Sequence, residues 1–405
     1  MIGGLPVRLK EGGGWTQWKL THEQARTIGE SELVDVAPGP ADVWKLRARS
    51  AKGVVGAVRL GRGPGTVQLS IIPKIPVDRL LYLLGYASGE VKWFDEPVSA
   101  AVRPDLLPAV AGTFARSAGR ALRPGVLLGY RDVEDTLPLL RGRLRAAAQL
   151  RRRPGLALPL EVSYDDHTVD IAENQILLGA IRSLLRTPGV TPASRAALRG
   201  LEAGLDGVTA PVPGAPLPRW TATRLNRRYQ QALGLAALVL SGGSYELEDG
   251  RNVSVDGLLV TMWRVYESFL GQALGEALRQ RIGGRAETQD LAHYLDLGRQ
   301  HRLKPDLVHY LSSPVVVADA KYKPERDRGD LYQMLAYCLR LGLSEGHLVY
   351  VSGSEDIVHI PVGRETVSVH RHVLDLTLPY EDLRLRIAEL ADRLLRVRPA
   401  GCATG

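Results

Sequence analysis

The chain has 405 residues, of which 45% are hydrophobic, and it carries a formal net charge of +8. This length suits two or three domains with sizeable cores, and the basic balance is compatible with a polyanionic partner without identifying one. Two cysteines are too few for a disulfide framework or a cysteine-rich zinc site, and with no signal-peptide pattern and no run of about 18 apolar residues we expect a cytoplasmic protein with no membrane partner.

Residues 1 to about 75 are predicted to be rich in β-strands, because short apolar or alternating runs are separated by glycine clusters. The glycine-rich turn at 61–65 fits a hairpin. It is not a phosphate-binding loop, because no Gly-Lys-Ser/Thr follows it and no helix is expected to begin there. We therefore expect this chain to bind no nucleotide itself. The predicted strands cover 15–20, 43–48, 54–60 and 66–72.

The middle of the chain is predicted to be mostly helical. A proline in the first turn supports a helix over 76–88. Residues 126–164 combine strands, turns and a basic stretch, and the proline-rich segment 211–218 links two later helices. The other predicted helices cover 106–122, 168–186, 193–205 and 221–240.

From about 242 to 375, predicted strands alternate with helices, which favours a mixed sheet flanked by helices. The predicted fold class is therefore α/β, or α+β overall. We predict a β-rich amino-terminal domain at 1–140, a mostly helical connecting region at 141–240, a mixed-sheet domain at 241–398 and a frayed tail at 399–405. The elements of the last domain are helices at 262–282, 328–342 and 380–396 and strands at 302–310, 314–321 and 346–352.

Two acids and a lysine in this last part carry the strongest functional signal. A Pro-Asp pair ending at Asp306 is followed, after twelve intervening residues, by Asp319 and Lys321 at the end of an apolar run. This pattern resembles the active site of metal-dependent nucleases of the PD-(D/E)xK class. The turn at 312–314 would make the two strands antiparallel neighbours, and residues two apart on a strand face the same side.

Phosphodiester cleavage needs an attacking water, a cation that neutralises developing charge, and a stabilised leaving oxygen. Because Mg²⁺ prefers carboxylate oxygens and keeps several waters, Asp306 and Asp319 are candidate ligands. Lys321 could orient the attacking water or help to deprotonate it, and could stabilise phosphate charge. Pro-Asp and Asp-x-Lys each occur often by chance, so the prediction of a nuclease site rests on their combination at this spacing.

Two further residues extend this candidate site. Glu267 shares a helical stripe with three leucines, and a carboxylate on an apolar stripe is costly unless it binds a metal or a partner. We therefore predict Glu267 as a third metal ligand, with a plain ion pair as the alternative. Gln333 and Tyr337 share one face of the helix after Lys321, so Gln333 could point back at the site. Hydrogen bonding within the core is the alternative for both.

Other reactive residue types have simpler interpretations. Cys338 lies in an apolar helix and is expected to pack in the core. The histidines show no metal-ligand spacing, and structural roles are expected for His301 and His309. Six arginines between residues 141 and 153 could follow a phosphate backbone or meet an acidic protein surface. They could also form a solvated face paired with the acids at 132–135.

The chain resembles the McrC family, the nuclease subunit of McrBC-type modification-dependent restriction systems. The segments at 304–306, 319–323 and 332–337 carry the most specific part of the resemblance, because they occur in order at nuclease spacing. The phenylalanine that usually begins the family's Phe-Glu pair is replaced by Tyr266, before Glu267. Further similar segments lie at 71–75, 80–86, 140–143, 174–177 and 224–229, and Tyr164 and Asp170 are similar as single residues.

The resemblance implies a division of labour. Asp306, Asp319 and Lys321 match the family's catalytic positions, whereas Glu267 and Gln333 match auxiliary ones. The amino-terminal part would dock on a hexameric AAA+ GTPase of the McrB type and stimulate its hydrolysis. That motor would move along DNA and recognise modified cytosine, and this chain would cut double-stranded DNA with Mg²⁺.

Two other functions remain open at this point. The chain could be a non-catalytic adaptor or regulator of an AAA+ motor, in which case the acids would serve structure only. It could also be a stand-alone basic DNA-binding protein, whose binding would depend on salt and need no metal.

Overall fold

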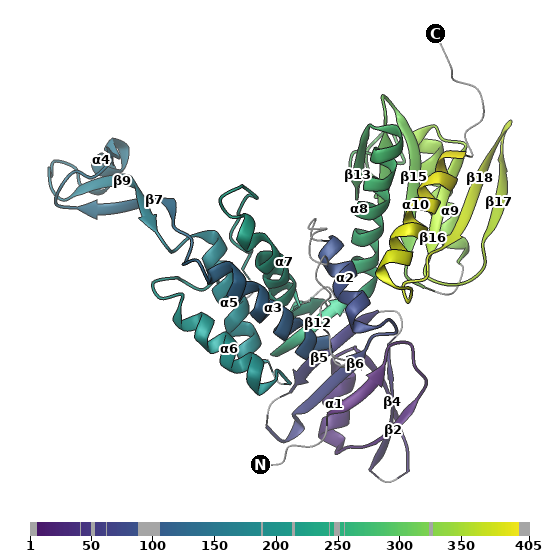
Figure 1. Cartoon of the computed structure of the whole chain (residues 1–405), viewed down its shortest axis with the longest axis horizontal. Coiled ribbons are helices and arrows are strands. Elements are labelled where there is room, and N and C mark those ends of the chain that lie inside the picture. Colours follow the sequence, from purple (N-terminus) through teal and green to yellow (C-terminus); the bar gives the residue numbers. More distant parts are fainter. Residues whose placement is uncertain are drawn as a thin grey trace. The chain divides into compact units, whose positions relative to one another are not determined.

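A computed structural model, shown in Figure 1, gives the fold of the chain. The chain folds into two compact units, each assembled from segments that are separate in the sequence. One unit consists of 1–5, 57–69 and 107–259, and the other of 6–56, 70–106 and 260–405. The structure describes residues 6–40, 42–49, 53–61, 63–87, 106–187, 189–212, 215–242, 244–246, 252–254, 256–323 and 327–396.

The amino-terminal residues form short strands, as predicted. Strands β2 (Thr16–Lys19), β4 (Val43–Ala48) and β3 (Val34–Pro38) pair antiparallel in that order. A second sheet has the order β1-β6-β5-β12, so β5 and β6 are neighbours, as the predicted hairpin requires. Its strands are β1 (Val7–Lys10), β6 (Val67–Ile72), β5 (Val54–Leu60) and β12 (Asp256–Thr261).

Helix α1 (His22–Glu30) was not predicted between these strands. Its signal is local: Thr21 accepts a hydrogen bond from the Gln24 backbone, and the Gln24 side chain accepts one from the Thr21 backbone. This capping box satisfies two backbone donors at the start of the helix. The helix buries only Ala25 and Ile28, so its sequence lacks the repeated apolar positions from which a helix is predicted.

The unit that contains residues 107–259 is built on helices, as predicted. Helix α5 packs against α6 and α7, and its Asn174 amide donates to the Leu127 and Val169 carbonyls at 2.8 and 2.7 Å. The helices are α3 (Leu106–Leu122), α5 (Ala172–Arg186), α6 (Pro192–Ala203) and α7 (Arg227–Ser241). The short strands β10 (Ser244–Glu246) and β11 (Asn252–Ser254) pair antiparallel.

Two of these helices begin later than predicted. The predicted helix at 168–186 starts at Ala172, because Thr168 still belongs to a strand and its hydroxyl accepts the Asp170 N–H. The predicted helix at 221–240 starts at Arg227, because the Asn226 side chain accepts the Thr223 N–H at 2.8 Å and closes a turn there. Side-chain hydrogen bonds of this kind compete with helical ones.

The basic stretch is divided between a two-residue strand of a small sheet, 143–144, and a short helix, 146–152, that follows it. Four of its six arginines form ion pairs: Arg145 with Glu134, Arg152 and Arg153 with the buried Glu161, and Arg141 with Asp166. Pairing with Glu134 was the alternative drawn from the sequence, whereas the two acids of β9 were not foreseen. The sheet has the order β7-β9-β8, with β7 (Gly129–Leu137), β9 (Leu160–Thr168), β8 (Arg143–Leu144) and the adjacent helix α4 (Ala146–Arg152).

The carboxy-terminal part contains the predicted mixed sheet flanked by helices (Figure 1). Its order is β13-β14-β15-β16-β18-β17, with β15 and β18 parallel to β16 and the other pairs antiparallel. The strands are β13 (Arg285–Thr288), β14 (Leu307–Tyr310), β15 (Pro314–Lys321), β16 (Glu345–Tyr350), β17 (Asp356–Val362) and β18 (Glu365–Val373). The helices are α2 (Val77–Ala87), α8 (Met262–Ile282), α9 (Arg328–Leu341) and α10 (Tyr380–Arg396).

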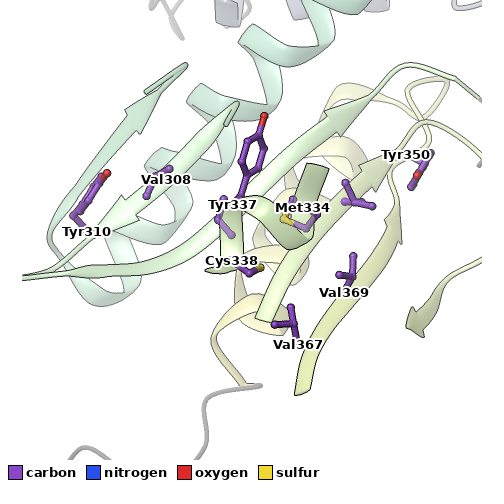
Figure 2. Close-up of a cluster of buried hydrophobic side chains, with 10 residues drawn as sticks. Val308, Tyr310, Met334, Tyr337, Cys338, Tyr350, Val367 and Val369 are labelled. Carbon is purple, nitrogen blue, oxygen red and sulfur yellow. The ribbon is translucent and has the colours of Figure 1, made fainter. Parts of the chain in front are cut away.

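Helices α8 and α9 are held closely to this sheet. Met334 and Cys338 of α9 pack on Val308 and Val369 of the strands, as Figure 2 shows, and Val317 belongs to the same cluster. Cys338 is therefore a core residue, as predicted. On α8, Gly271 and Gly275 allow a close approach to β13. A Cβ at these positions would lie 2.9 Å from Thr288 and 2.8 Å from Ala286.

Some predicted bounds in this part were wrong. The predicted strand at 302–310 begins only at Leu307, because Pro305 has no N–H to donate to a ladder, and Arg302 forms an isolated bridge with Tyr294. The helix after Lys321 ends at Leu341, where Gly342 takes a left-handed conformation with φ of 69°.

The predicted tail at 399–405 lies outside the described residues, and the predicted domain limits stay predictions. Among the described residues, no helix is long and apolar enough to cross a membrane.

Three histidines that the sequence did not single out are buried together on β16 and β18. His347 lies opposite His370 in the strand register, and its Nδ1 is 3.2 Å from Nε2 of His372. Burial lowers the pKa of His347, because charged imidazole loses its solvation there. Burial and the nearby Arg393 charge lower the pKa of His372 to about 4. The cluster therefore packs as neutral rings.

This cluster predicts a loss of stability on mild acidification. Because the pKa of His372 is lower in the folded chain than the ordinary value of 6.5, the unfolded chain binds more protons between pH 6.5 and 4. The free energy of unfolding should therefore fall as pH drops through this window. His372 alone should contribute about 1 kcal/mol of the loss between pH 7.5 and 5.5.

Denaturant unfolding at the two pH values tests this. The His372→Gln variant should lose less stability on acidification than the unchanged chain, whereas His359→Gln, at an exposed histidine of β17, should lose the same amount. Equal pH dependence of all three proteins would contradict the prediction.

Candidate active site

The structure brings all five predicted site residues to one cavity of about 370 Å³. Asp306 lies just before β14, Asp319 and Lys321 lie at the end of β15, Glu267 comes from α8, and Gln333 comes from α9. The cavity is open, and further lining residues are Trp263, Arg302, Leu303, Lys304, Ala336 and Tyr337.

The two aspartates are held side by side by neighbouring strands, Asp319 within β15 and Asp306 immediately before β14. Strand β14 pairs antiparallel with β15, with Leu307 opposite Ala318, so the predicted turn at 312–314 does connect neighbours. The N–H of Ala320, the residue between Asp319 and Lys321, donates to Oδ2 of Asp306 at 2.8 Å. Asp306 and Asp319 are 7% and 3% exposed, so both carboxylates are largely withdrawn from water.

Burial and the charges of neighbouring acids raise the pKa values of Asp306 and Glu267. Burial raises the pKa of Asp306 to about 8, and the charges of Asp319 and Glu267 act in the same direction. Burial, and then the charge of Asp319, also raise the pKa of Glu267. A cation among these groups would relieve the repulsion between them.

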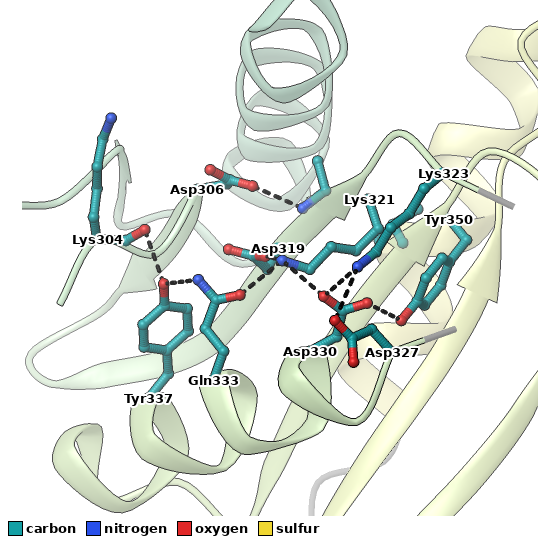
Figure 3. Close-up of polar contacts among 12 residues, drawn as sticks. Lys304, Asp306, Asp319, Lys321, Lys323, Asp327, Asp330, Gln333, Tyr337 and Tyr350 are labelled. Carbon is teal, nitrogen blue, oxygen red and sulfur yellow. Dashed lines mark hydrogen bonds and ion pairs between the residues drawn. The ribbon is translucent and has the colours of Figure 1, made fainter. Parts of the chain in front are cut away.

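Lys321 is surrounded by acceptors, as Figure 3 shows. Its Nζ forms an ion pair with Asp319, donates to Oε1 of Gln333 at 2.8 Å, and lies 3.6 Å from Asp330. Burial alone would lower the pKa of Lys321, but the neighbouring acids outweigh it, and the pKa is raised. The ammonium form is therefore favoured, which supports orientation and charge stabilisation over deprotonation of a water.

Gln333 points back at the site, as predicted, and a hydrogen-bond chain sets its direction. Its Nε2 donates to the Tyr337 hydroxyl at 2.8 Å, and that hydroxyl donates to the Lys304 carbonyl at 3.0 Å (Figure 3). The Oε1 atom is thereby left to accept from Lys321. Tyr337 is also buried in the core, so both interpretations drawn from the sequence apply to it.

The sequence interpretation missed Asp330, a buried acid in the first turn of α9. Its carboxylate accepts from the Tyr350 hydroxyl at 2.8 Å, forms an ion pair with Lys323 at 3.0 Å, and faces Lys321 (Figure 3). The only signal for Asp330 in the sequence is its position three residues after the helix cap Asp327. An acid in the first turn of a helix is favourable there whether or not it belongs to a site, so this position did not indicate a functional role.

A second group missed from the sequence joins the amino-terminal residues to the end of β15. The Tyr322 hydroxyl, next to Lys321, donates to Oε2 of Glu11 at 3.2 Å. The same oxygen accepts the Lys74 N–H at 3.1 Å, and the Lys74 ammonium lies 5.6 Å from the Tyr322 ring centre. Burial raises the pKa of Glu11.

The donor set fits a magnesium site built on two carboxylates. Among the described residues, no group of three or more His, Cys, Asp or Glu side chains is arranged to hold a metal ion as it stands. Mg²⁺ is usually held by one or two carboxylates and several waters, so Asp306 and Asp319 suffice. Direct ligation by Glu267 stays a prediction. His309 has a structural contact, as expected, with Nε2 2.8 Å from the Gly283 carbonyl.

One family model matches most of the chain. The model of a family described as "McrBC 5-methylcytosine restriction system component" matches residues 50–351. A chain in the refined half-complex from the tetradecameric assembly of Thermococcus gammatolerans McrB AAA+ hexamers with bound McrC is 19% identical, with a TM-score of 0.57. The match covers 96% of this chain and 100% of that chain, which supports the same overall fold.

A chain in the cryo-EM structure of the Thermococcus gammatolerans McrBC complex is 21% identical, with a TM-score of 0.41. That match covers 68% of this chain and 88% of that chain. No curated protein matches this sequence.

The contacts of Asp330 predict that it stabilises the site. Asp330→Ala would leave the largely buried Lys321 and Tyr350 without one of their partners. We expect the free energy of unfolding to fall by about 3 kcal/mol in denaturant titrations. The control is Asp327→Ala in the same helix start, which removes an exposed cap and should cost about 1 kcal/mol. Equal losses in both variants would show that the Asp330 contacts add nothing.

Proposed function

The chain belongs to the family of McrBC 5-methylcytosine restriction system components, and on that basis we propose that it is the DNA-cutting subunit of such a system. Specifically, we propose a Mg²⁺-dependent endonuclease of the PD-(D/E)xK class. The observation that carries this proposal is the placement of two buried aspartates and a lysine in one open cavity, with Asp319 and Lys321 on β15 and Asp306 just before the adjacent strand β14.

Each site residue has a task in this proposal. Asp306 and Asp319 would hold Mg²⁺, which when bound supplies positive charge against the charge that develops on the phosphate. The Lys321 ammonium orients the attacking water and compensates the same charge. Gln333 keeps Lys321 in place through its 2.8 Å contact. Glu267 adds a further carboxylate from α8 at the cavity wall.

The cost of the site argues against a purely structural role for its acids. Carboxylates that are buried and repel each other reduce folding stability unless another group compensates them. A non-catalytic adaptor or a simple DNA-binding protein has no use for such a cluster beside an open cavity. Perturbed carboxyl groups of this kind are instead typical of active sites.

The similarity to the Thermococcus gammatolerans assembly suggests the partner. That structure contains McrB AAA+ hexamers with bound McrC. We propose that this chain likewise acts with a hexameric GTPase of the McrB type, docks through residues within 1–140 and stimulates its hydrolysis. The substrate would be cytoplasmic double-stranded DNA with modified cytosine, recognised by the partner, and this chain would bind no nucleotide itself.

Removal of a central site residue should abolish cutting. Asp319→Ala removes a metal ligand, and Lys321→Ala removes the cation that orients the water, so each should reduce cleavage at least about a hundredfold. The measurement is cleavage of methylated duplex DNA by the complex with the GTPase and Mg²⁺. Excess EDTA should stop cutting, and added Mg²⁺ should restore it.

The control for these variants is Arg364→Ala, at an exposed turn residue, which should cut normally. Circular dichroism and stimulation of GTP hydrolysis should be unchanged in all three proteins. Full cleavage by Asp319→Ala would overturn the nuclease proposal. Stimulated hydrolysis without any metal-dependent cutting by the unchanged chain would instead favour the adaptor function.

The hydrogen-bond chain through Gln333 predicts a smaller effect. Gln333→Ala and Tyr337→Phe both loosen the contact that positions Lys321, so kcat should fall about 10- to 100-fold while KM changes little. Arg340→Ala, on the exposed side of the same helix, serves as the control. A rise in KM at unchanged kcat would show that Gln333 binds substrate instead of positioning Lys321.

A further inference from the structure

A loop of residues 289–304, here called the cavity loop, leads from β13 to the catalytic Asp306. It carries three exposed leucines within seven residues: Leu291, Leu295 and Leu297 are 48%, 54% and 94% exposed. Single exposed leucines are common on protein surfaces. Three on one short loop, the last almost entirely in solvent, form an apolar tip.

The cavity loop is ordered by its own hydrogen bonds. Leu295 N–H donates to the His301 carbonyl at 2.8 Å, and Leu303 N–H donates to the His293 carbonyl at 2.9 Å. Asp296 accepts the N–H groups of Gln300 and His301 at 2.8–3.1 Å and so closes the turn at the tip. The loop is therefore a short hairpin that presents Leu297 in a defined position.

The base of the loop is attached to the sheet beside the site. The Tyr310 hydroxyl of β14 donates to Asp290 at 2.5 Å and lies 2.7 Å from Nε2 of His293. Gln289 N–H donates to the Asp306 carbonyl at 3.1 Å. The start of the loop is therefore hydrogen-bonded to residues at or beside β14, and its end leads through Asp306 into that strand.

Positive charge follows the loop from its tip into the cavity. Arg299 and Arg302 lie over the Tyr294 ring, 5.8 and 5.1 Å from its centre, and Arg302 and Lys304 line the catalytic cavity. The acids of the loop are already engaged: Asp290 with Tyr310 and Asp296 with backbone N–H groups. The exposed face is thus basic and apolar.

We propose that the cavity loop is a DNA-contacting element of this chain. In this inference Leu297 enters a groove of the duplex, while Arg299, Arg302 and Lys304 contact phosphates on the path to the catalytic acids. The inference rests on the proposed function, because it takes duplex DNA as the substrate of the cavity. Apolar side chains that enter a groove between flanking cations occur in many DNA-bending proteins.

Two observations favour DNA over a protein partner at this loop. The cations are continuous with the cavity in which a phosphodiester would be cut, so one duplex could occupy both. The two arginines of the loop, whose neighbouring loop acids are already hydrogen-bonded, also suit a phosphate backbone, whereas protein interfaces usually mix both signs of charge.

Binding without cleavage tests the loop separately from the chemistry. The full chain would be titrated with a fluorescent duplex in EDTA over a range of salt concentrations. Arg299→Gln should weaken binding about three- to tenfold and reduce the salt slope by about 1. Leu297→Gln should weaken binding by a similar factor, about three- to tenfold, at an unchanged salt slope, because it removes an apolar contact. Arg364→Gln and Leu385→Gln, at exposed positions elsewhere, are the matched controls.

A second readout reports on the duplex itself. A 2-aminopurine base in the duplex should brighten on binding of the unchanged chain, because a leucine in the groove unstacks it, and Leu297→Gln should lose this signal. Loop variants that bind and unstack DNA as the controls do would overturn the inference. So would a chain that binds no duplex at low salt, or loop variants that lose only the GTPase partner.

Failure of the proposed function gives a different result. If the unchanged complex never cuts DNA with Mg²⁺ while the loop variants still lose DNA binding, the nuclease proposal fails and the DNA-contacting loop stands.

Discussion

One hydrogen bond organises the candidate site: the Ala320 N–H donates to the carboxylate of Asp306. On a strand, Ala320 points away from the cavity while Asp319 and Lys321 on either side point toward it. Its N–H therefore holds Asp306, just before β14, beside Asp319 and Lys321 of β15. Without this contact, the buried Asp306 would be a repelled carboxyl group with no partner on β15.

The helices on the two faces of the sheet complete the arrangement. Glycines of α8 bring Glu267 close to the strands, and the core contacts of α9 fix the side that carries Gln333. The site is therefore rigid because its supports are ordinary core packing. Asp330 extends the same logic, since it ties Lys321, Lys323 and Tyr350 to the first turn of α9.

The positive charge of Lys321 compensates the negative charges of the site's acids only in part. Lys321 remains charged because three acids outweigh its burial, whereas the carboxyl groups of Asp306 and Glu267 are pushed toward their neutral forms. Such a cluster costs folding stability in the absence of a cation. The fold therefore brings together carboxyl groups that repel one another, and in the proposed metal-dependent chemistry the binding of Mg²⁺ would offset that repulsion.

The sequence by itself determined most elements near the site and which five residues would lie together there, because those signals are local. The apolar run of β15 with Asp319 and Lys321 two residues apart, the apolar stripe of α8 and the four-residue spacing of Gln333 and Tyr337 each act within one element. Only the tertiary structure decided which partners meet across elements: Asp330 with Lys321, Glu11 with Tyr322, and the buried histidines of β16 and β18. Residues far apart in sequence become neighbours through strand order and helix packing, which no short pattern encodes.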